Sequence, residues 1–121
     1  DQVRGMTAEA RGLGLRLMID LVINHCAVDS ELVRTHPEWF VRAGKGVANP
    51  FCVEADGNKV VWRDLAQFDH TGSRDADGLL HYCGDVVEYL ISLGFAAMRL
   101  IRSRGLSGAA SSGGSAPRIR T

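Results

Sequence analysis

An apolar run at residues 14–25 constrains the fold more than any other stretch, because it ends abruptly in Asn24 and His25. The length of the run, and the helical pattern ahead of it, predict a buried parallel strand rather than a strand with one solvated face. Asp20 interrupts the run. Because burying an unpaired carboxylate costs on the order of several kcal/mol, we expect Asp20 to have a partner such as an arginine or a hydrogen-bond network.

The elements around this strand follow from spacing. Apolar residues at helical spacing over residues 1–12, followed by Gly12 and Gly14, predict a helix that ends just before the strand. A helix, a short glycine turn and a buried strand form the second half of a βαβ unit. In α/β barrels and open α/β sheets the carboxyl ends of the strands carry the functional residues, so Asn24 and His25 are candidate site residues.

Residues 26–78 show no long periodicity. Ser30 is a candidate N-cap for a short helix over residues 31–35, which the following His36-Pro37 pair stops. Residues 50–53 and 59–62 predict short strands, with Asp56-Gly57-Asn58 as a hairpin turn. A connection of this length inside a compact domain is expected to be functional or a subdomain.

An apolar stripe with a period near 3.6 predicts a second helix over residues 79–93, closed by Gly94. A strand is expected next, but residues 96–101 give way to a tract of Gly, Ala, Ser and Arg. With so few aliphatic residues, the segment 102–121 cannot bury enough apolar surface to fold. We therefore expect a disordered C-terminal tail.

Composition narrows the possible functions. The chain has 121 residues with 14 basic and 14 acidic side chains, so nothing favours binding to nucleic acid or to an anionic membrane. The cysteines Cys26, Cys52 and Cys83 are odd in number and lack a C-x-x-C spacing, which argues against a disulfide framework and a structural zinc site. A reducing cytoplasm fits this pattern, and the sequence has neither a leader pattern nor an apolar run long enough for a membrane span.

The segment from Asp20 to His25 resembles the D-x-V-x-N-H motif on the third barrel strand of the α-amylase family, glycoside hydrolase family 13. The resemblance continues through residues 29–30, 36–40 and 61–65 to Gly94-Phe95 and covers about residues 1–95. It implies an α/β fold that is a fragment of a (β/α)8 TIM barrel, because a whole barrel needs about 250 residues.

The resemblance divides the chain into four parts. Residues 1–25 correspond to barrel helix 2 and strand 3, and residues 26–78 to the subdomain inserted after that strand. Residues 79–101 correspond to helix 3 and an aborted strand, so we expect the chain to stop before a proper fourth strand, and residues 102–121 are the tail. Open sheet edges and uncovered faces predict low stability or aggregation.

The resemblance also implies roles for four residues. His25 and Asn24 are expected to bind substrate, with His25 hydrogen-bonding a sugar hydroxyl. In some family members the residue matching Asn24 also gives its carbonyl oxygen to calcium, so we expect no cofactor other than a possible calcium ion. Asp20 and Asp64 are expected to support the site, Asp20 through its charge network and Asp64 as a neighbouring or calcium-binding carboxylate.

Each of these residues has a structural alternative. On spacing alone His25 suits a satisfied histidine at a strand end, but the surrounding motif favours the substrate-binding role. Asp64 is equally suited to an N-cap of a helix over residues 65–68. Three aromatic residues in the inserted region suit either a small core, the preferred interpretation, or sugar-stacking platforms: Trp39, Phe40 and Trp62. A transition-metal triad is a third possibility, formed by His25, Asp29 and His36. The spacing of these residues matches no helical ligand pair.

The resemblance implies a parent glycosidase or transglycosidase that acts on α-linked glucans or maltooligosaccharides with retention. That mechanism needs a nucleophile and an acid/base carboxylate, and we assign no catalytic residue to this chain. Family members continue after Gly-Phe with a segment like R-C-D-A-A-Y, whose Asp is the nucleophile. One base inserted ahead of the codons for residues 96–102 permits R-C-D-A-A-Y-Q, so we hypothesise a frameshift after Phe95.

The chain alone is therefore predicted to be inactive. Two alternatives stay open for it. Residues 36–40 are reminiscent of the branch that builds glucan from maltosyl phosphate, which suggests a remnant of a maltosyltransferase. The other alternative is a non-catalytic α/β fragment that binds a partner or a sugar weakly.

Overall fold

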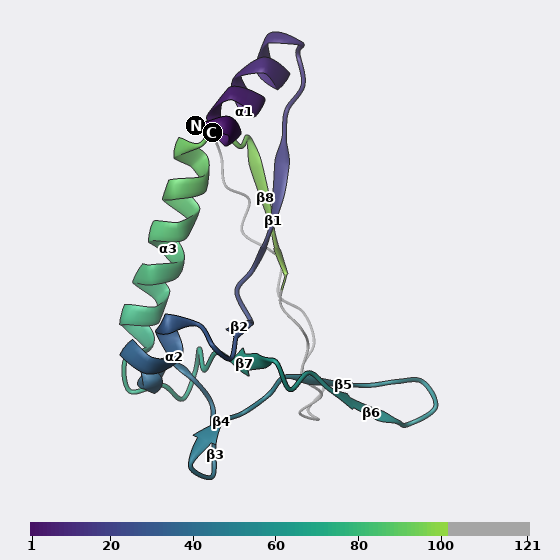
Figure 1. The fold of residues 1–121 in the computed structure, drawn as a ribbon, viewed down its shortest axis with the longest axis vertical. Helices are drawn as coiled ribbons and strands as arrows, with labels where there is room; N and C mark the ends of the chain where they lie inside the picture. Colours follow the sequence, from purple (N-terminus) through teal and green to yellow (C-terminus); the bar gives the residue numbers. More distant parts are fainter. Residues whose placement is uncertain (102–121) are drawn as a thin grey trace, which may run out of the picture.

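The computed structural model describes residues 1–101 of the chain. The predictions for the segment 102–121 lie outside the described residues. The longest helix, α3, runs alongside a pair of parallel strands, β1 and β8 (Figure 1). Helix α1 lies at one end of this arrangement, and the small helices and hairpins lie at the other end.

Helix α1 spans Gln2–Gly12, as the apolar spacing predicts. Gly14 takes a φ of 75°, a left-handed conformation that glycine adopts without strain, and turns the chain toward β1. The hydroxyl of buried Thr7 donates a hydrogen bond of 2.5 Å to the carbonyl oxygen of Leu93 at the end of α3. A Cβ on Gly94 would lie 2.5 Å from that hydroxyl oxygen, so the close approach of the two helices requires glycine there.

Strand β1 (Met18–Val22) pairs in parallel with β8 (Ala97–Ile101), with Met18 opposite Ala97 and Asp20 opposite Arg99. The parallel strand is confirmed, but its predicted burial is wrong: Met18, Asp20 and Val22 are exposed, and the other two residues are half-buried. The reason is architectural. Within residues 1–101 the sheet has two strands, so neither edge is paired further and the barrel is not closed.

Strand β8 also corrects the expectation that the chain stops before a proper fourth strand. Met98, Leu100 and Ile101 are apolar residues that suit a strand, and Arg99 finds a charged partner on β1. The chain from β1 through α3 to β8 therefore forms a βαβ crossover with a long insertion after its first strand.

The insertion begins with β2 (His25–Ala27), which pairs antiparallel with β7 (Leu65–Gln67). Helix α2 spans Glu31–Thr35, and the Ser30 hydroxyl accepts a hydrogen bond from the Leu32 backbone N–H, so the predicted cap and helix are confirmed. A single 3-10 turn, η1 (Pro37–Trp39), follows.

Two antiparallel hairpins extend from this region (Figure 1). The second confirms the predicted turn, because Gly57 has a φ of 85° and lies between its two strands. In that hairpin the Lys59 ammonium lies 3.9 Å from the centre of the Phe51 ring. The hairpins comprise β3 (Arg42–Ala43) with β4 (Gly46–Val47), and β5 (Phe51–Val53) with β6 (Lys59–Val61).

Helix α3 spans Ala76–Ser92 and begins three residues earlier than its apolar stripe predicts. The Asp75 carboxylate accounts for the earlier start, because it accepts a hydrogen bond of 3.1 Å from the Gly78 backbone N–H and so caps the first turn. The same carboxylate accepts a hydrogen bond of 2.8 Å from the Trp39 indole N–H. This contact fixes η1 against the beginning of α3.

The described core is a small cluster at this end of α3. Its apolar side chains come from η1 and β7, from the residue that follows each of them, and from the first turn of α3. The rings of Phe40 and Phe68 stack with their centroids 4.9 Å apart. The preferred interpretation of Trp39 and Phe40 as core residues is confirmed, whereas Trp62 is exposed and stands outside the cluster. The cluster consists of Trp39, Phe40, Ala66, Phe68 and Leu79.

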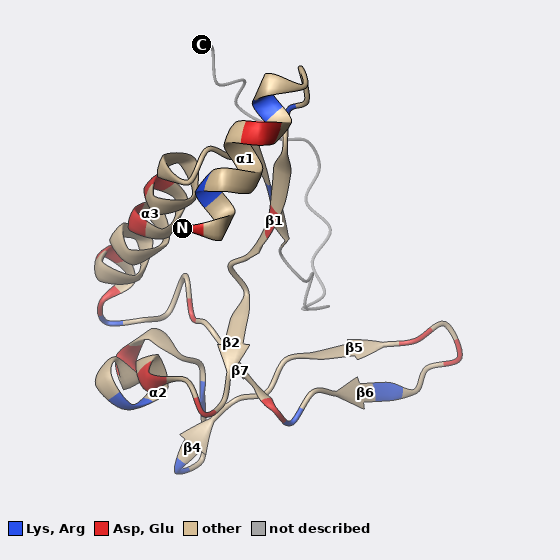
Figure 2. Cartoon of the chain, turned by 45° about the horizontal axis from the view of Figure 1, so that its top comes forward, with Lys and Arg blue, Asp and Glu red and all other residues tan. Residues whose placement is uncertain are grey.

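Charged side chains of both signs are interspersed along the described elements (Figure 2). Within residues 1–101, none of the helices combines the length and the apolar character that crossing a membrane requires.

Candidate functional site

The candidate site lies where β1 ends and β2 begins. Asn24 is buried, and its backbone carbonyl accepts a hydrogen bond of 2.9 Å from the Phe68 N–H. The side-chain nitrogen Nδ2 of Asn24 lies 3.4 Å from Nδ1 of His25. The two neighbouring residues that the sequence predicts to bind substrate therefore contact each other through their side chains.

His25 is half-buried at the first position of β2, directly opposite Gln67 on β7. Cross-strand partners in an antiparallel pair project to the same face of the ladder, so Gln67 is on the same face as His25. An imidazole and two amides can each both donate and accept hydrogen bonds, which suits the hydroxyl groups of a neutral ligand. Gln67 did not stand out in the sequence because no motif or period marks it.

His70 is a second residue that the sequence did not reveal. Its Nε2 lies 2.5 Å from the carbonyl oxygen of Ile23, so the imidazole N–H donates to the last backbone group of the apolar run. Its ring centre lies 6.1 Å from that of Phe68. His70 therefore positions the backbone immediately ahead of Asn24 and His25, a role that depends on a contact across 47 residues.

Asp20 has the arginine partner that the sequence predicts. Arg99 on β8 donates from Nε to one carboxylate oxygen at 2.8 Å and from a terminal nitrogen to the other at 2.5 Å. The hydrogen bonds from the Arg99 guanidinium lower the pKa of Asp20 below its ordinary value. The Asp20 carboxylate therefore forms a cross-strand ion pair with Arg99. In this ionised form it has no proton to donate.

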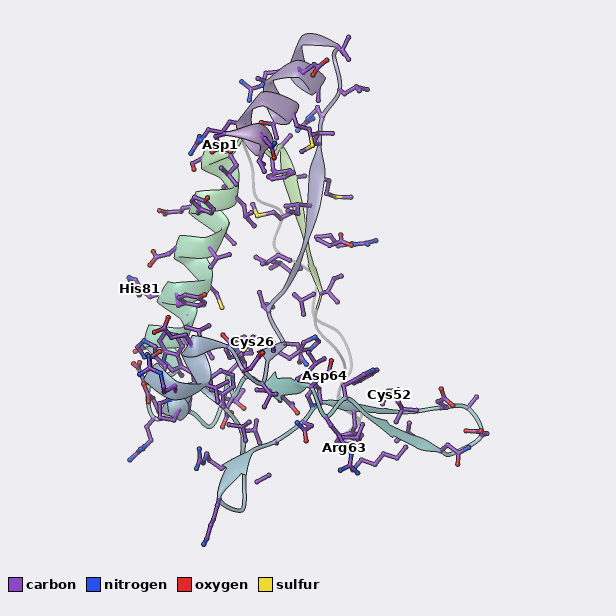
Figure 3. All side chains as sticks on the ribbon, in the orientation of Figure 1. Asp1, Cys26, Cys52, Arg63, Asp64 and His81 are labelled. Atoms are coloured by element: carbon purple, nitrogen blue, oxygen red, sulfur yellow. The ribbon has the colours of Figure 1, made fainter. Side chains whose placement is uncertain are left out.

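Asp64 does not join this group. It is exposed at the outer end of the β2–β7 ladder, where its backbone carbonyl accepts from the Val28 N–H at 2.8 Å. Figure 3 labels Asp64 next to the end of β7 from which the β5–β6 hairpin extends. The residue opposite His25 is Gln67, three positions further along β7, so about 10 Å of strand separates Asp64 from His25. Its alternative role as a helix cap is wrong, because residues Leu65–Gln67 form a strand.

The described residues do not fit a calcium ion at Asn24. Calcium takes about 6–8 oxygen ligands at distances near 2.4 Å. Asn24 lies opposite Phe68, four positions from Asp64, and about 13 Å of strand therefore separates the two predicted ligands. Nor do residues 1–101 hold a group of three or more His, Cys, Asp and Glu side chains placed for a metal ion. His36 instead stacks on Trp39, with ring centres 3.9 Å apart.

An apolar cleft of about 140 Å³ lies beside His25, between the end of β1 and the first turns of α3. Its walls include Leu21, Phe68 and Tyr82, and the thiols of Cys26 and Cys83. Burial raises the pKa of both thiols, so they remain protonated and unreactive at neutral pH. The lining of the cleft beside His25 is mostly apolar and holds no carboxylate.

The chain is similar to a small part of larger enzymes. Over 102 residues the chain is 31% identical to an alpha-1,4-glucan:maltose-1-phosphate maltosyltransferase of Mycolicibacterium smegmatis, a match that covers 83% of this chain and 13% of that protein. No protein-family model matches the chain.

Solved structures of α-amylases also match the chain. A maltogenic α-amylase from Thermotoga neapolitana matches with a TM-score of 0.65 and 27% identity, over 88% of this chain and 22% of that one. An α-amylase from Lactobacillus plantarum matches with a TM-score of 0.63 and 28% identity, over 81% of this chain and 20% of that one. The chain therefore matches a small part of α-amylase-family enzymes, and the resemblance noted in the sequence is confirmed.

Proposed function

We propose that this chain supplies the substrate-binding end of barrel strand 3 in an α-glucan-active enzyme of the α-amylase type. The observation that carries the proposal is the contact between Asn24 and His25 at the carboxyl end of β1, in a chain that matches two α-amylase structures over 88% and 81% of its length. The chain spans 13% of its curated relative, so the activity of the whole enzyme is part of the proposal.

In this proposal His25 and Asn24 hold hydroxyl groups of an α-linked glucan. The imidazole accepts from one hydroxyl or donates to it, Gln67 provides a neighbouring amide, and His70 fixes the backbone ahead of them. Asp20 and Arg99 keep β1 and β8 in register beneath the site. Asp64 supports the inserted region rather than the sugar. These groups bind and orient the substrate.

Catalysis is assigned elsewhere. Retaining glycoside cleavage uses a nucleophile and an acid/base carboxylate about 5–5.5 Å apart. Met98 stands three residues after Phe95, where the resembled segment has its nucleophilic Asp, and a thioether cannot replace a carboxylate in that step. Binding groups that stabilise ground state and transition state equally do not raise the rate of the chemical step. The 121-residue chain is therefore inactive in this proposal.

The frameshift hypothesis explains why methionine stands at that position. The DNA around the Phe95 codon tests it directly. A reading frame that continues into further barrel strands once one base is restored would support the frameshift, whereas the absence of such a frame would refute it.

An activity assay tests the proposed function. The purified chain should release no reducing sugar from starch above a buffer blank, whereas the frame-restored enzyme should be active and should lose activity when its strand-four Asp becomes Asn. In the restored enzyme, His25→Ala should lower kcat/KM about tenfold or more through the lost hydrogen bond. His81→Ala is the matched control, because His81 is exposed on α3 (Figure 3).

Starch hydrolysis by the 121-residue chain itself, abolished by His25→Ala, would overturn the assignment of catalysis to other strands. A second candidate function is maltosyl transfer, which the maltosyltransferase relative favours. The restored enzyme separates the two: release of phosphate from maltose 1-phosphate with growth of the glucan indicates a transferase, and reducing sugar from glucan alone indicates a hydrolase. If the restored protein binds maltoheptaose but shows neither reaction, the non-catalytic alternative holds.

A further inference from the structure

A second cleft, of about 440 Å³, lies between η1 and the loop that precedes α3. We call it the η1 cleft. Its volume falls within the range of about 300–1,000 Å³ that small-molecule sites occupy. Two carboxylates and two guanidiniums line it, so its charges balance. They belong to Glu38, Asp69, Arg42 and Arg74.

Hydrogen bonds fix the loop that forms one wall of the η1 cleft. The Asp69 carboxylate accepts from the Gly72 N–H at 2.7 Å and from the Thr71 N–H at 3.3 Å. The Ser73 hydroxyl donates to the Glu38 carbonyl oxygen at 2.6 Å, which ties this wall to η1. Because these walls are already ordered, little conformational entropy is lost when a ligand binds.

The balance of charges indicates the kind of ligand. Carboxylates accept hydrogen bonds and guanidiniums donate them, so the lining suits groups that do both, as hydroxyls do. Arg74 is exposed and makes neither an ion pair nor a hydrogen bond with another residue in the described range 1–101. Because the lining has no excess charge, an uncharged ligand enters without leaving a charge uncompensated.

The η1 cleft is separate from the candidate site at His25. Phe40 lines the η1 cleft, and Phe68 lines the apolar cleft beside His25. The two rings stack with their centres 4.9 Å apart and are both buried, so the aromatic cluster stands between the two clefts. Both clefts lie at the same end of the βαβ crossover, next to the beginning of α3.

We propose that the η1 cleft binds a neutral glucan segment at a point separate from the His25 site. The choice of glucan as the hydroxyl-bearing ligand rests on the proposed function, whereas the cleft itself rests on its geometry and charge balance. A second contact of this kind holds a long polymer on the protein through two linked binding events, which raises the overall affinity for long chains.

Backbone amide NMR of the 121-residue chain with maltoheptaose tests this proposal. We expect the amides of residues 71–75 to shift in a saturable manner. Arg74→Gln should weaken the dissociation constant reported by these amides about tenfold, because it removes a charge-assisted hydrogen bond. Arg16→Gln is the matched control: it makes the same change at an exposed arginine near the beginning of β1 and should leave the constant unchanged.

Shifts at residues 23–26 report the His25 site independently. Shifts there without shifts at 71–75, or equal effects of Arg74→Gln and Arg16→Gln, would overturn the η1 proposal and leave the proposed function intact. Shifts at 71–75 alone would support the cleft and count against the His25 site. Inorganic phosphate is the charged probe. If phosphate shifts the amides of residues 71–75 and maltoheptaose does not, the assignment of a neutral ligand is wrong. Should Arg74→Gln not fold, Arg42→Gln provides the same test from the opposite wall.

Discussion

The aromatic cluster and the β1–β8 ladder are both made from segments far apart in the sequence, yet they differ in how they exclude water. In the cluster, Leu79 is 0% exposed and Phe40 is 2% exposed. In the ladder, Met18 is 60% exposed and Leu100 is 56% exposed, although the strands keep five residues in parallel register. The cluster has elements on several sides, whereas within residues 1–101 the ladder consists of two strands.

This difference shows that strand pairing and burial are separate contributions. The ladder satisfies backbone groups and aligns Asp20 with Arg99, but apolar burial stabilises by roughly 25 cal/mol for each Å² removed from water, and the ladder removes little. In the aromatic cluster, by contrast, apolar burial is the main stabilising contribution. We therefore expect the described fold to depend on the cluster and to tolerate changes in the ladder.

Leu79→Ala should have the largest effect. A buried leucine truncated to alanine costs about 2–5 kcal/mol through lost burial and the cavity left behind, which is comparable to the whole stability of a chain with so small a core. Circular dichroism during urea unfolding measures it. Leu80→Ala is the matched control, because Leu80 is 69% exposed and should change stability by less than about 0.5 kcal/mol. Equal effects would show that the cluster does not hold the fold.

Trp39→Phe should rank second. It keeps an aromatic ring but removes the indole N–H that donates to Asp75 at 2.8 Å, and a hydrogen bond to a charged group contributes about 1.5–3 kcal/mol. We expect the urea midpoint to fall by the corresponding amount. Trp62→Phe is the control on an exposed ring without this partner. A loss no greater than that of the control would mean that the link between η1 and α3 is unimportant.

Leu100→Ala should change stability by less than about 0.5 kcal/mol, because its side chain is already mostly in water. The same urea unfolding, repeated at several protein concentrations, measures it. A loss of about 2 kcal/mol or more that grows with concentration would show that the ladder is covered in solution by a second copy of the chain.

Asp20→Asn should have the smallest effect, and the effect should depend on pH. Because Arg99 lowers the pKa of Asp20, the pair stabilises the fold above the unfolded-state pKa of this carboxylate, and that stabilisation is lost as pH falls through the lower folded-state value. Solvent screens both exposed side chains. Unfolding midpoints of wild type and variant should therefore differ slightly at neutral pH and converge in acid. Asp29→Asn makes the same change at an exposed carboxylate and is the matched control, and a pH-independent difference for Asp20→Asn would contradict the ion-pair explanation.

Local signals in the sequence predicted much of the fold. The helix over Gln2–Gly12, the helix over Glu31–Thr35 with its Ser30 cap, and the turn at Gly57 follow from interactions among neighbouring residues. The polar end of the apolar run marked Asn24 and His25 as candidate site residues, and the carboxylate inside that run predicted a partner for Asp20, which is Arg99. Adjacent residues and strong chemical mismatches can be recognised without knowing the fold.

Other features were decided by tertiary structure alone. The sequence predicted burial for β1 and an interrupted strand at residues 97–101, and both predictions were wrong because each depends on a distant partner. The helix predicted over residues 79–93 is present, and only its start differs, because the Asp75 cap is a local interaction that the apolar stripe does not mark. Exposure of β1 depends on which strands and layers surround it, and β8 forms because β1 offers a free edge and Asp20 pairs with Arg99. His70 contacts Ile23 across 47 residues, a distance over which spacing carries no signal. The sequence by itself determined the local elements and the chemistry at the end of β1, whereas the fold decided which of these residues are buried and which distant groups they meet.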